Sequence, residues 1–170
     1  MAATALPIRG PIAGSTVYKD GKLVARDITL TLPSITFGLG EYKAMGSLEI
    51  PNPTQLDAME LAMTKAGIDR ELASICQPGF SGFECRWAQD VMKPDGTTAL
   101  EGCKAFFKAA PKGIPGLAVE MGSVSENEIT LAVVRYQLFI AGQEILLADK
   151  LNGILKVNGV SYTSKLQSLL

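Results

Sequence analysis

The C-terminal part of the sequence shows an apolar alternation that glycine turns interrupt at short intervals. Residues 133 to 162 read VVRYQLFIAGQEILLADKLNGILKVNGVSY. Asn152-Gly153 and Asn158-Gly159 favour tight hairpin turns, and Ala141-Gly142 fits a type I turn closed by a left-handed glycine. The pattern therefore predicts an antiparallel meander with strands over residues 129–140, 144–148 and 154–157.

The first of these strands is expected to carry one wholly apolar face. Side chains alternate between the two faces of a strand, which places on that face Ala132, Val134, Tyr136, Leu138 and Ile140. The other face combines apolar side chains with Arg135 and Gln137. We expect that second face to be partly wet or covered by a partner.

The N-terminal third also has the pattern of short strands. Residues 17–24, VYKDGKLV, predict a hairpin with Asp20-Gly21 at its turn. Apolar side chains alternate with threonines from residue 28 to 32, and Pro33 then marks an edge or a bend. Gly38 and Gly40 predict a second break, after which residues 48–50 resume the strand.

The segment PNPTQLDAMELAMTKAGI predicts the one convincing helix. Asn52 is a suitable N-cap, and Pro53 suits the first helical position. Helical spacing then connects four side chains, Leu56, Met59, Met63 and Ala66. Gly67 stands where a left-handed residue ends a helix. A weaker helical turn is predicted over residues 69–75.

The middle of the chain predicts two more strands and one long loop. Phe83, Cys85 and Trp87 share a face, which makes Trp87 a core residue or an anchor between subunits. Asp95-Gly96 marks a turn, and ALEGCKAFFKAA reads as a strand. The loop over residues 110–128 is long for a small domain, so we expect it to contact a neighbouring molecule.

Length and composition indicate one globular domain. The chain has 170 residues, 47% of them hydrophobic and 19% charged, enough for one core. We expect a flexible N-terminal arm over residues 1–15 and a single β domain over residues 16–170. The predicted fold is mainly β, an antiparallel β-sandwich or open β-barrel with one flanking α-helix.

Charge and missing residue types exclude several functions. Sixteen basic and seventeen acidic residues give a net charge of −1, which argues against a general nucleic-acid binder. No histidine is present, so Ser-His-Asp and Cys-His catalysis and His-ligated metals are excluded within one chain. Asp57 and Glu60 lie one helical turn apart in the predicted helix, where an exposed face explains them better than a site. We expect no enzyme activity, no cofactor and no metal.

Several fragments in this order resemble the major tail tube protein of contractile-tailed bacteriophages and R-type bacteriocins. They are the Asp-Gly followed downstream by Leu-Pro, the Glu-Tyr-Lys-Ala, and an ending with the patterns Y-x-L-x-x-x-G-x-E and D-x-x-N-G-x-x-x-V-N-G. The resemblance extends from about residue 16 to the end. It departs at AMGS after Tyr42, where family members tend to carry a glycine pair followed by methionine.

The resemblance implies a structural protein of the virion. Subunits would form hexameric rings, and the rings would stack into a hollow tube inside the contractile sheath, assembled in the host cytoplasm. The implied partners are further copies of this chain, the tail sheath protein, the baseplate hub or tube initiator, the tape-measure protein and the tail terminator. DNA would pass through without sequence-specific binding, and this chain would not insert into a membrane. No catalytic residue or cofactor comes with the family.

Two sets of residues are expected to act in such a tube. DNA slides best past a neutral or acidic wall, since lysine and arginine hold phosphates; we therefore predict a bore lined by strands of residues 26–50, with Glu41 and Glu49 facing the lumen. The ordinary alternative is that both glutamates face solvent on the outside. The predicted assembly contacts are Leu32, Phe37, Tyr42, Met45, Leu48, Trp87, Ile114 and Leu117.

Two other functions fit the same residues. The chain is also consistent with the inner tube of a bacteriocin or type VI-like injection machine. A closed β-barrel that binds a small apolar ligand is the other alternative, because barrels of about eight strands can hold one.

Overall fold

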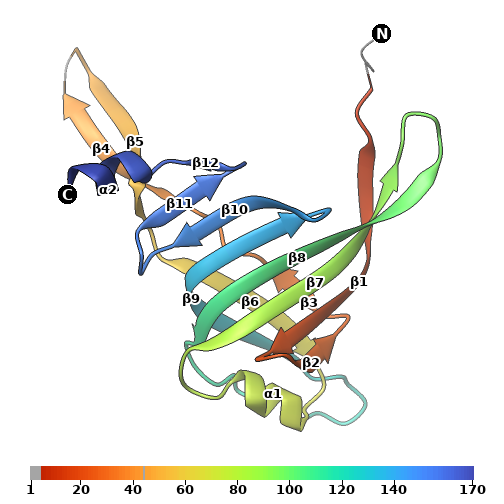
Figure 1. The fold of residues 1–170 in the computed structure, drawn as a ribbon. Coiled ribbons are helices and arrows are strands. Elements are labelled where there is room, and N and C mark those ends of the chain that lie inside the picture. Colours follow the sequence, from red (N-terminus) through yellow and green to blue (C-terminus); the bar gives the residue numbers. More distant parts are fainter. Residues whose placement is uncertain (1–4, 44) are drawn as a thin grey trace.

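The computed structural model describes residues 5–43 and 45–170, and one large antiparallel sheet dominates it (Figure 1). The strands are β1 (Ile8–Lys19), β2 (Lys22–Arg26), β3 (Thr29–Thr31), β4 (Phe37–Lys43), β5 (Ser47–Leu56), β6 (Met59–Ala66), β7 (Ser81–Met92), β8 (Thr98–Pro111), β9 (Glu126–Ile140), β10 (Gln143–Asp149), β11 (Ile154–Val157) and β12 (Val160–Ser161). Two short helices, α1 (Arg70–Ile75) and α2 (Ser164–Leu169), complete the fold. The predicted mainly β, antiparallel fold is confirmed.

The sheet has the strand order β12-β11-β10-β9-β8-β7-β1-β2, and β6 and β3 branch from β9. In Figure 1, β3 and β6 lie behind β7 and β8. A single cluster of buried side chains from β6, β7, β8 and β9 fills the space between the two layers. Within residues 5–43 and 45–170 the strand path ends at two separate edges, β12 and β2, so it does not close into a barrel. The closed-barrel alternative therefore has no support.

A bulge in β9 reverses the faces of this strand halfway along. Lys108 pairs with Arg135 but the next residue, Ala109, pairs with Val133, which leaves Val134 as the extra residue. The pairing partner of β9 also changes here. The first part of the strand, up to Val133, pairs with β6, and the part that begins at Arg135 pairs with β10. The buried side chains are consequently Ile129, Leu131, Val133 and Tyr136. The predicted apolar face through Ala132 and Val134 is wrong, because strict alternation cannot continue across a bulge.

Three of the predicted glycine turns form two-residue hairpin connections, whereas Asn152 and Gly153 belong to a four-residue connection, residues 150–153, between β10 and β11. Asp20 and Gly21 have φ values of 48° and 81° between β1 and β2, and Asn158 and Gly159 have 53° and 80° between β11 and β12. Ala141 and Gly142 both have positive φ as well, 50° and 80°. This is the pattern of a type I′ turn rather than the predicted type I, and it matches the twist of paired strands.

The predicted helix over residues 52–67 is wrong, because the segment belongs to β5 and β6. Met59, Leu61 and Met63 are buried and alternate with less buried residues. Met59 and Met63 fit a period of two as well as a helical period. Eight successive pairs with β9 select the strand, since tertiary pairing overrides local propensity. The Asn52 side chain accepts the N–H of Thr54 at 3.0 Å instead of capping a helix.

The weaker helical turn is confirmed as α1. Asp69 is its N-cap, and its carboxylate accepts the N–H of Leu72 at 2.8 Å. Leu72 and Ile75 are the buried residues of this helix. The predicted single helix is thus replaced by two short ones, α1 and α2.

The N-terminal segment is paired from residue 8 onward. Residues 8–15, which we placed in the arm, belong to β1 and pair with β7 from Ile8↔Met92 to Ser15↔Trp87. Residues 1–4 of the arm lie outside the described residues. Its flexibility and the single domain over residues 16–170 stay predictions. No helix in the described part of the chain is both long enough and apolar enough to cross a membrane.

Candidate assembly surfaces

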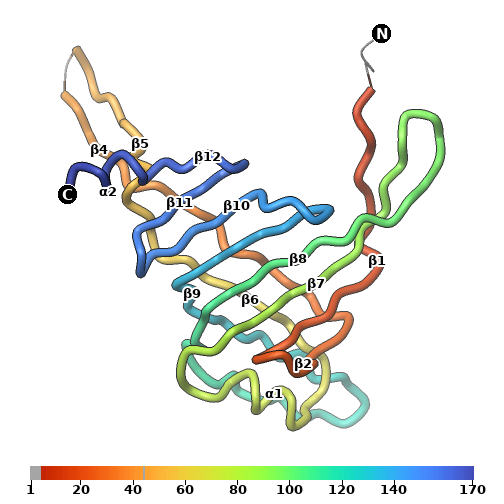
Figure 2. Tube along the Cα trace, in the orientation of Figure 1, coloured from red at the N-terminus to blue at the C-terminus, as the bar shows by residue number. Residues whose placement is uncertain are grey.

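The hairpin of β4 and β5 forms a separate two-stranded sheet that projects from the body of the molecule (Figure 2). The break predicted at Gly38 and Gly40 is wrong, because both lie inside β4. The absence of a side chain at Gly38 has a steric reason. A Cβ on Gly38 would lie 3.0 Å from the Cβ of Gln55 on the facing strand, so only glycine fits there without displacing that side chain.

The hairpin has two chemically different faces. Tyr42 pairs with Leu48 and Gly40 with Ile50, so one face carries exposed apolar side chains over a glycine. Glu41 pairs with Glu49 on the other face. Both glutamates are exposed in the single subunit, and their position in a lumen stays a prediction.

The remaining predicted contact residues fall into two groups. Leu32, Phe37 and Trp87 are half-buried and pack against the core. Met45 at the tip of the hairpin, and Ile114 and Leu117 in the loop after β8, are exposed. The structure thus brings Tyr42, Met45 and Leu48 together and places the two loop residues elsewhere.

The loop over residues 112–125 carries a second group of exposed apolar side chains. Five of its residues belong to this group: Ile114, Leu117, Val119, Met121 and Val124. Two backbone hydrogen bonds fix its ends: Lys112 N–H donates to the Thr130 carbonyl, and Gly67 N–H donates to the Ser125 carbonyl. Within the loop, Ser123 N–H donates to the Glu120 carbonyl and closes a turn. Exposed apolar patches of this kind mark interaction sites.

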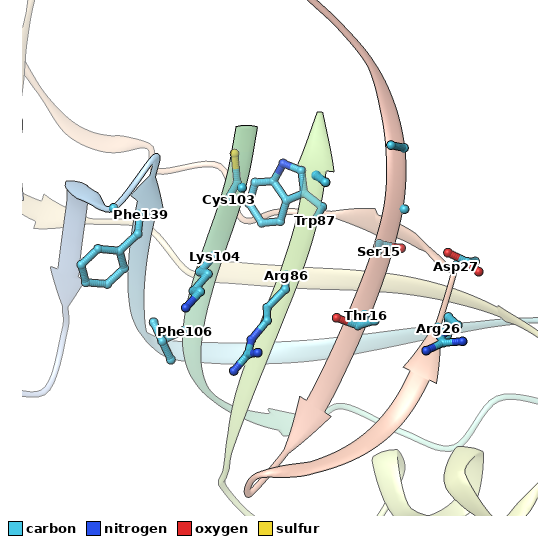
Figure 3. Close-up of a pocket in the computed structure, with 15 residues that line it drawn as sticks. Ser15, Thr16, Arg26, Asp27, Arg86, Trp87, Cys103, Lys104, Phe106 and Phe139 are labelled. Atoms are coloured by element: carbon cyan, nitrogen blue, oxygen red, sulfur yellow. The ribbon is translucent and has the colours of Figure 1, made fainter. Parts of the chain in front are cut away.

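An open groove of about 910 Å³ lies on the sheet where β1, β2, β7, β8 and β9 meet (Figure 3). Its floor is formed by small residues that stand opposite one another in register, Gly14, Ala88 and Gly102. Phe106 and Phe139 line one side, with their rings edge to face and their centroids 5.7 Å apart.

Three cations surround this groove. Arg86 donates to Glu84 at 2.5 Å, and its guanidinium lies 4.7 Å from the Tyr18 ring centroid. Arg26 and Lys104 also line the groove, and neither forms an ion pair with a described carboxylate. Asp27 is the one acidic lining residue. The groove is therefore apolar at its floor and basic at its rim.

The metal-ligating side chains of the described residues are dispersed. No group of three Cys, Asp or Glu side chains among them is arranged to hold a metal ion. Cys76, Cys85 and Cys103 are buried and unpaired. Burial, with Glu84 nearby, raises the pKa of the Cys85 thiol to about 12, so this sulfur is not a thiolate nucleophile at neutral pH. The features that stand out are surfaces.

The basic groove was not predicted from the sequence. Its lining residues come from positions 13 to 142, and only the register of five strands brings them together. The available signal was the outward position of Arg86 and Lys104, which alternate with Cys85 and Cys103 in strands that were predicted correctly.

Comparisons with known proteins place the fold. The family model for phage tail tube protein FII matches residues 11–170. No curated protein matches the sequence significantly. Among solved structures, the PVC sheath/tube terminator of an extracellular contractile injection system, in the extended state, is similar with a TM-score of 0.54 at 15% identity; the match covers 81% of this chain and 99% of that chain.

Two further solved structures are similar at comparable levels. The PVC sheath–tube complex in the extended state gives a TM-score of 0.52 at 14% identity, covering 81% of this chain and 93% of that chain. The tube terminating cap of the anti-feeding prophage gives a TM-score of 0.51 at 18% identity, and the match covers 82% of this chain and 99% of that chain. At these identities the similarity establishes the fold, and it agrees with the family match.

Proposed function

Since this chain belongs to the phage tail tube protein FII family, a structural and non-enzymatic family, we propose that its copies form hexameric rings that stack into a hollow tube for DNA ejection into the host. The observation that carries this proposal is the amount of unsatisfied surface on the single subunit. Within the described residues, β12 and β2 each pair with another strand on one side only, and the projecting hairpin and the 112–125 loop expose apolar side chains. Open edges and apolar patches are what association with further copies covers.

Closed rotational symmetry explains how such edges are satisfied without aggregation. Each copy offers one edge of its sheet to the opposite edge of the next copy, and the last copy in a ring meets the first. The hairpin and the loop remain available for contacts within the ring or between stacked rings. The proposed contact residues are those of the sequence prediction, of which Tyr42, Met45, Leu48, Ile114 and Leu117 are the exposed ones.

We further propose that Glu41 and Glu49 face the bore. A wall with carboxylates repels phosphates weakly and does not hold them, so DNA slides. Their exposure on one face of the hairpin is compatible with this role. DNA then passes without sequence-specific contacts.

The proposed partners follow from the position of a tube inside a tail. They are the sheath, the baseplate hub or tube initiator, the tape-measure protein and the terminator, and assembly takes place in the host cytoplasm. The fold similarity to a sheath–tube complex and to terminators supports the sheath and the terminator in this set. Because those structures belong to contractile injection systems and a prophage, the tube of a bacteriocin-like or injection machine is the second candidate. Neighbouring genes for capsid proteins distinguish a phage from such a machine.

Negative-stain electron microscopy of the purified chain tests the proposal. Rings with six-fold symmetry, or tubes of stacked rings, are expected on addition of the initiating baseplate. A compact monomer that persists at high concentration, alone and with the baseplate, would contradict the proposed function.

A further inference from the structure

Two surfaces of this subunit have complementary chemistry but lie apart. The groove on the sheet is apolar with a basic rim, whereas the 112–125 loop is apolar with acidic residues around it. The loop contains Glu120 and, at its first position, Lys112, whose charge is paired with Glu60. Glu126 and Glu128 follow the loop in β9 and are exposed. The hairpin, another exposed apolar element, carries Lys43 beside its glutamates. Charge therefore favours the loop as the element that fits the groove.

The groove has room for side chains from another molecule. A Cβ placed on Gly102 would meet no atom within 4 Å, so the space above this part of the floor is open. Phe106 is exposed and Phe139 is half-buried, and their edge-to-face rings form an apolar wall beside this space. Arg26 and Lys104 are exposed.

The loop presents an apolar–acidic–apolar sequence outward. Val119 is 89% exposed and Met121 is 100% exposed, with Glu120 between them. The turn from Glu120 to Ser123 holds this stretch in place through the Ser123 N–H bond to the Glu120 carbonyl and through Gly122 at a φ of 83°. Two exposed hydrophobic side chains held next to a carboxylate have the chemistry to enter an apolar groove with a basic rim.

The two surfaces do not meet within one subunit. The loop lies beside α1 (Figure 2), at the end of the molecule where Gly67 bonds to Ser125. The groove crosses the outer side of the sheet, from Arg26 at the end of β2 to Gly142 in the β9–β10 turn. Complementary patches at different places on the same chain produce a head-to-tail contact that repeats from copy to copy.

We propose that the 112–125 loop of one copy binds in the groove of the next copy in the assembly. Val119 and Met121 pack against Phe106 and Phe139, and Glu120 lies toward Arg26 and Lys104. This inference rests on the proposed function, since it names the contact that joins subunits of the tube. The contact also places the basic groove away from the bore. In the bore, the cations of the groove would hold DNA phosphates.

A charge exchange between the two surfaces tests the contact. The groove variant combines Arg26→Glu with Lys104→Glu, and the loop variant is Glu120→Lys. All three residues are exposed, so the subunit is expected to keep its fold, which circular dichroism and thermal denaturation check. Each variant is expected to raise the critical concentration for tube assembly by about tenfold or more, because like charges then face each other. The combination of both variants is expected to restore assembly.

A charge reversal outside the groove is the matched control. Lys93→Glu reverses an exposed charge in the β7–β8 turn, outside the groove and away from the edge strands β12 and β2, and should leave assembly unchanged. Normal assembly by the groove variant, while wild-type tubes form, would overturn the loop-to-groove contact and leave the proposed function standing. A defect in the groove variant that Glu120→Lys neither reproduces nor compensates would assign the groove to another occupant, such as the sheath protein. Failure of the wild type to assemble with the baseplate would remove both proposals.

A disulfide provides a second readout that does not depend on charge. Met121→Cys and Phe139→Cys in one chain are expected to crosslink between copies and to give a ladder of covalent oligomers when tubes are oxidised. Neither single variant should give the ladder, because Cys76, Cys85 and Cys103 are buried. Tubes that form with both cysteines but without any ladder would contradict the proposed contact.

Discussion

Glu41 and Glu49 stand directly opposite each other across the β4–β5 hairpin. Like charges in this position destabilise a pair of strands, and neither carboxylate forms an ion pair within the described residues. The proposed function gives these two charges a use outside the single subunit. In the proposed tube that use is a wall along which DNA slides.

Reversing this pair tests its position. Glu41→Lys with Glu49→Lys should slow DNA ejection and leave tube length unchanged, because lysines in the bore would hold phosphates. The neutral variant Glu41→Gln with Glu49→Gln serves as the control and should eject at a rate near that of the wild type. Ejection is followed with a dye that binds released DNA. Unchanged kinetics in the lysine variant would count against the lumen position.

The strand assignment of residues 59–66 predicts a sharp contrast between neighbours. Leu61 is 0% exposed, so Leu61→Ala should lower the free energy of unfolding by about 3 kcal/mol through lost burial and a cavity. Glu60 points outward and pairs with Lys112 at 2.6 Å in an exposed ion pair. Glu60→Ala should therefore cost at most about 0.5 kcal/mol. Chemical denaturation of both variants measures the difference, and similar losses would refute the strand.

Turns could be predicted from the sequence, whereas the pairing of residues 59–66 could not. Asp20-Gly21 and Asn158-Gly159 were predicted correctly because a turn depends on the two residues that form it. Met59 to Ala66 were not, because their partner strand lies at residues 126–133 and the local pattern fits both periods. The bulge at Val134 is likewise set by the change of partner from β6 to β10. The groove likewise depends on the register of strands that are distant in the sequence, so it could not be predicted from the sequence.

The cap of α1 predicts a pH dependence of stability. Burial opposes ionisation of Asp69, but the Lys65 ammonium and the Leu72 N–H outweigh it and hold the pKa of this carboxyl below its ordinary value. The ionised cap therefore stabilises the fold above a pH of about 4, and the contribution is lost as the pH falls through the folded-state pKa.

Asp69→Asn is the variant that measures this contribution. It should reduce the free energy of unfolding by about 1–2 kcal/mol at pH 7, since the buried Lys65 loses its partner. The difference from the wild type should shrink when denaturation is repeated at pH 3. A constant difference at both pH values would show that the charge of Asp69 is not the cause.

The β9–β10 turn offers a stabilising substitution. Ala141 has a φ of 50°, a left-handed conformation that costs alanine more than asparagine. Ala141→Asn should raise the free energy of unfolding by about 0.5 kcal/mol, because Asn-Gly is the preferred pair of a type I′ turn. Ala141→Val, which is β-branched, should lower it. Thermal denaturation of the two variants gives the sign of each effect, and a destabilised asparagine variant would contradict this account of the turn.

The apolar face of the hairpin predicts a separation between folding and assembly. Tyr42 is 62% exposed and Leu48 is 54% exposed in the single subunit, so Tyr42→Ser with Leu48→Ser should change the free energy of unfolding by less than about 1 kcal/mol. In the proposed tube these side chains are covered by a neighbouring copy, and their loss should prevent sedimentable tubes from forming at wild-type concentrations. Leu151→Ser, which alters a residue that is 68% exposed in the β10–β11 turn, is the matched control and should assemble normally. If the double variant forms tubes with the yield of the wild type, this face does not join subunits, and the hairpin's apolar side chains need another explanation.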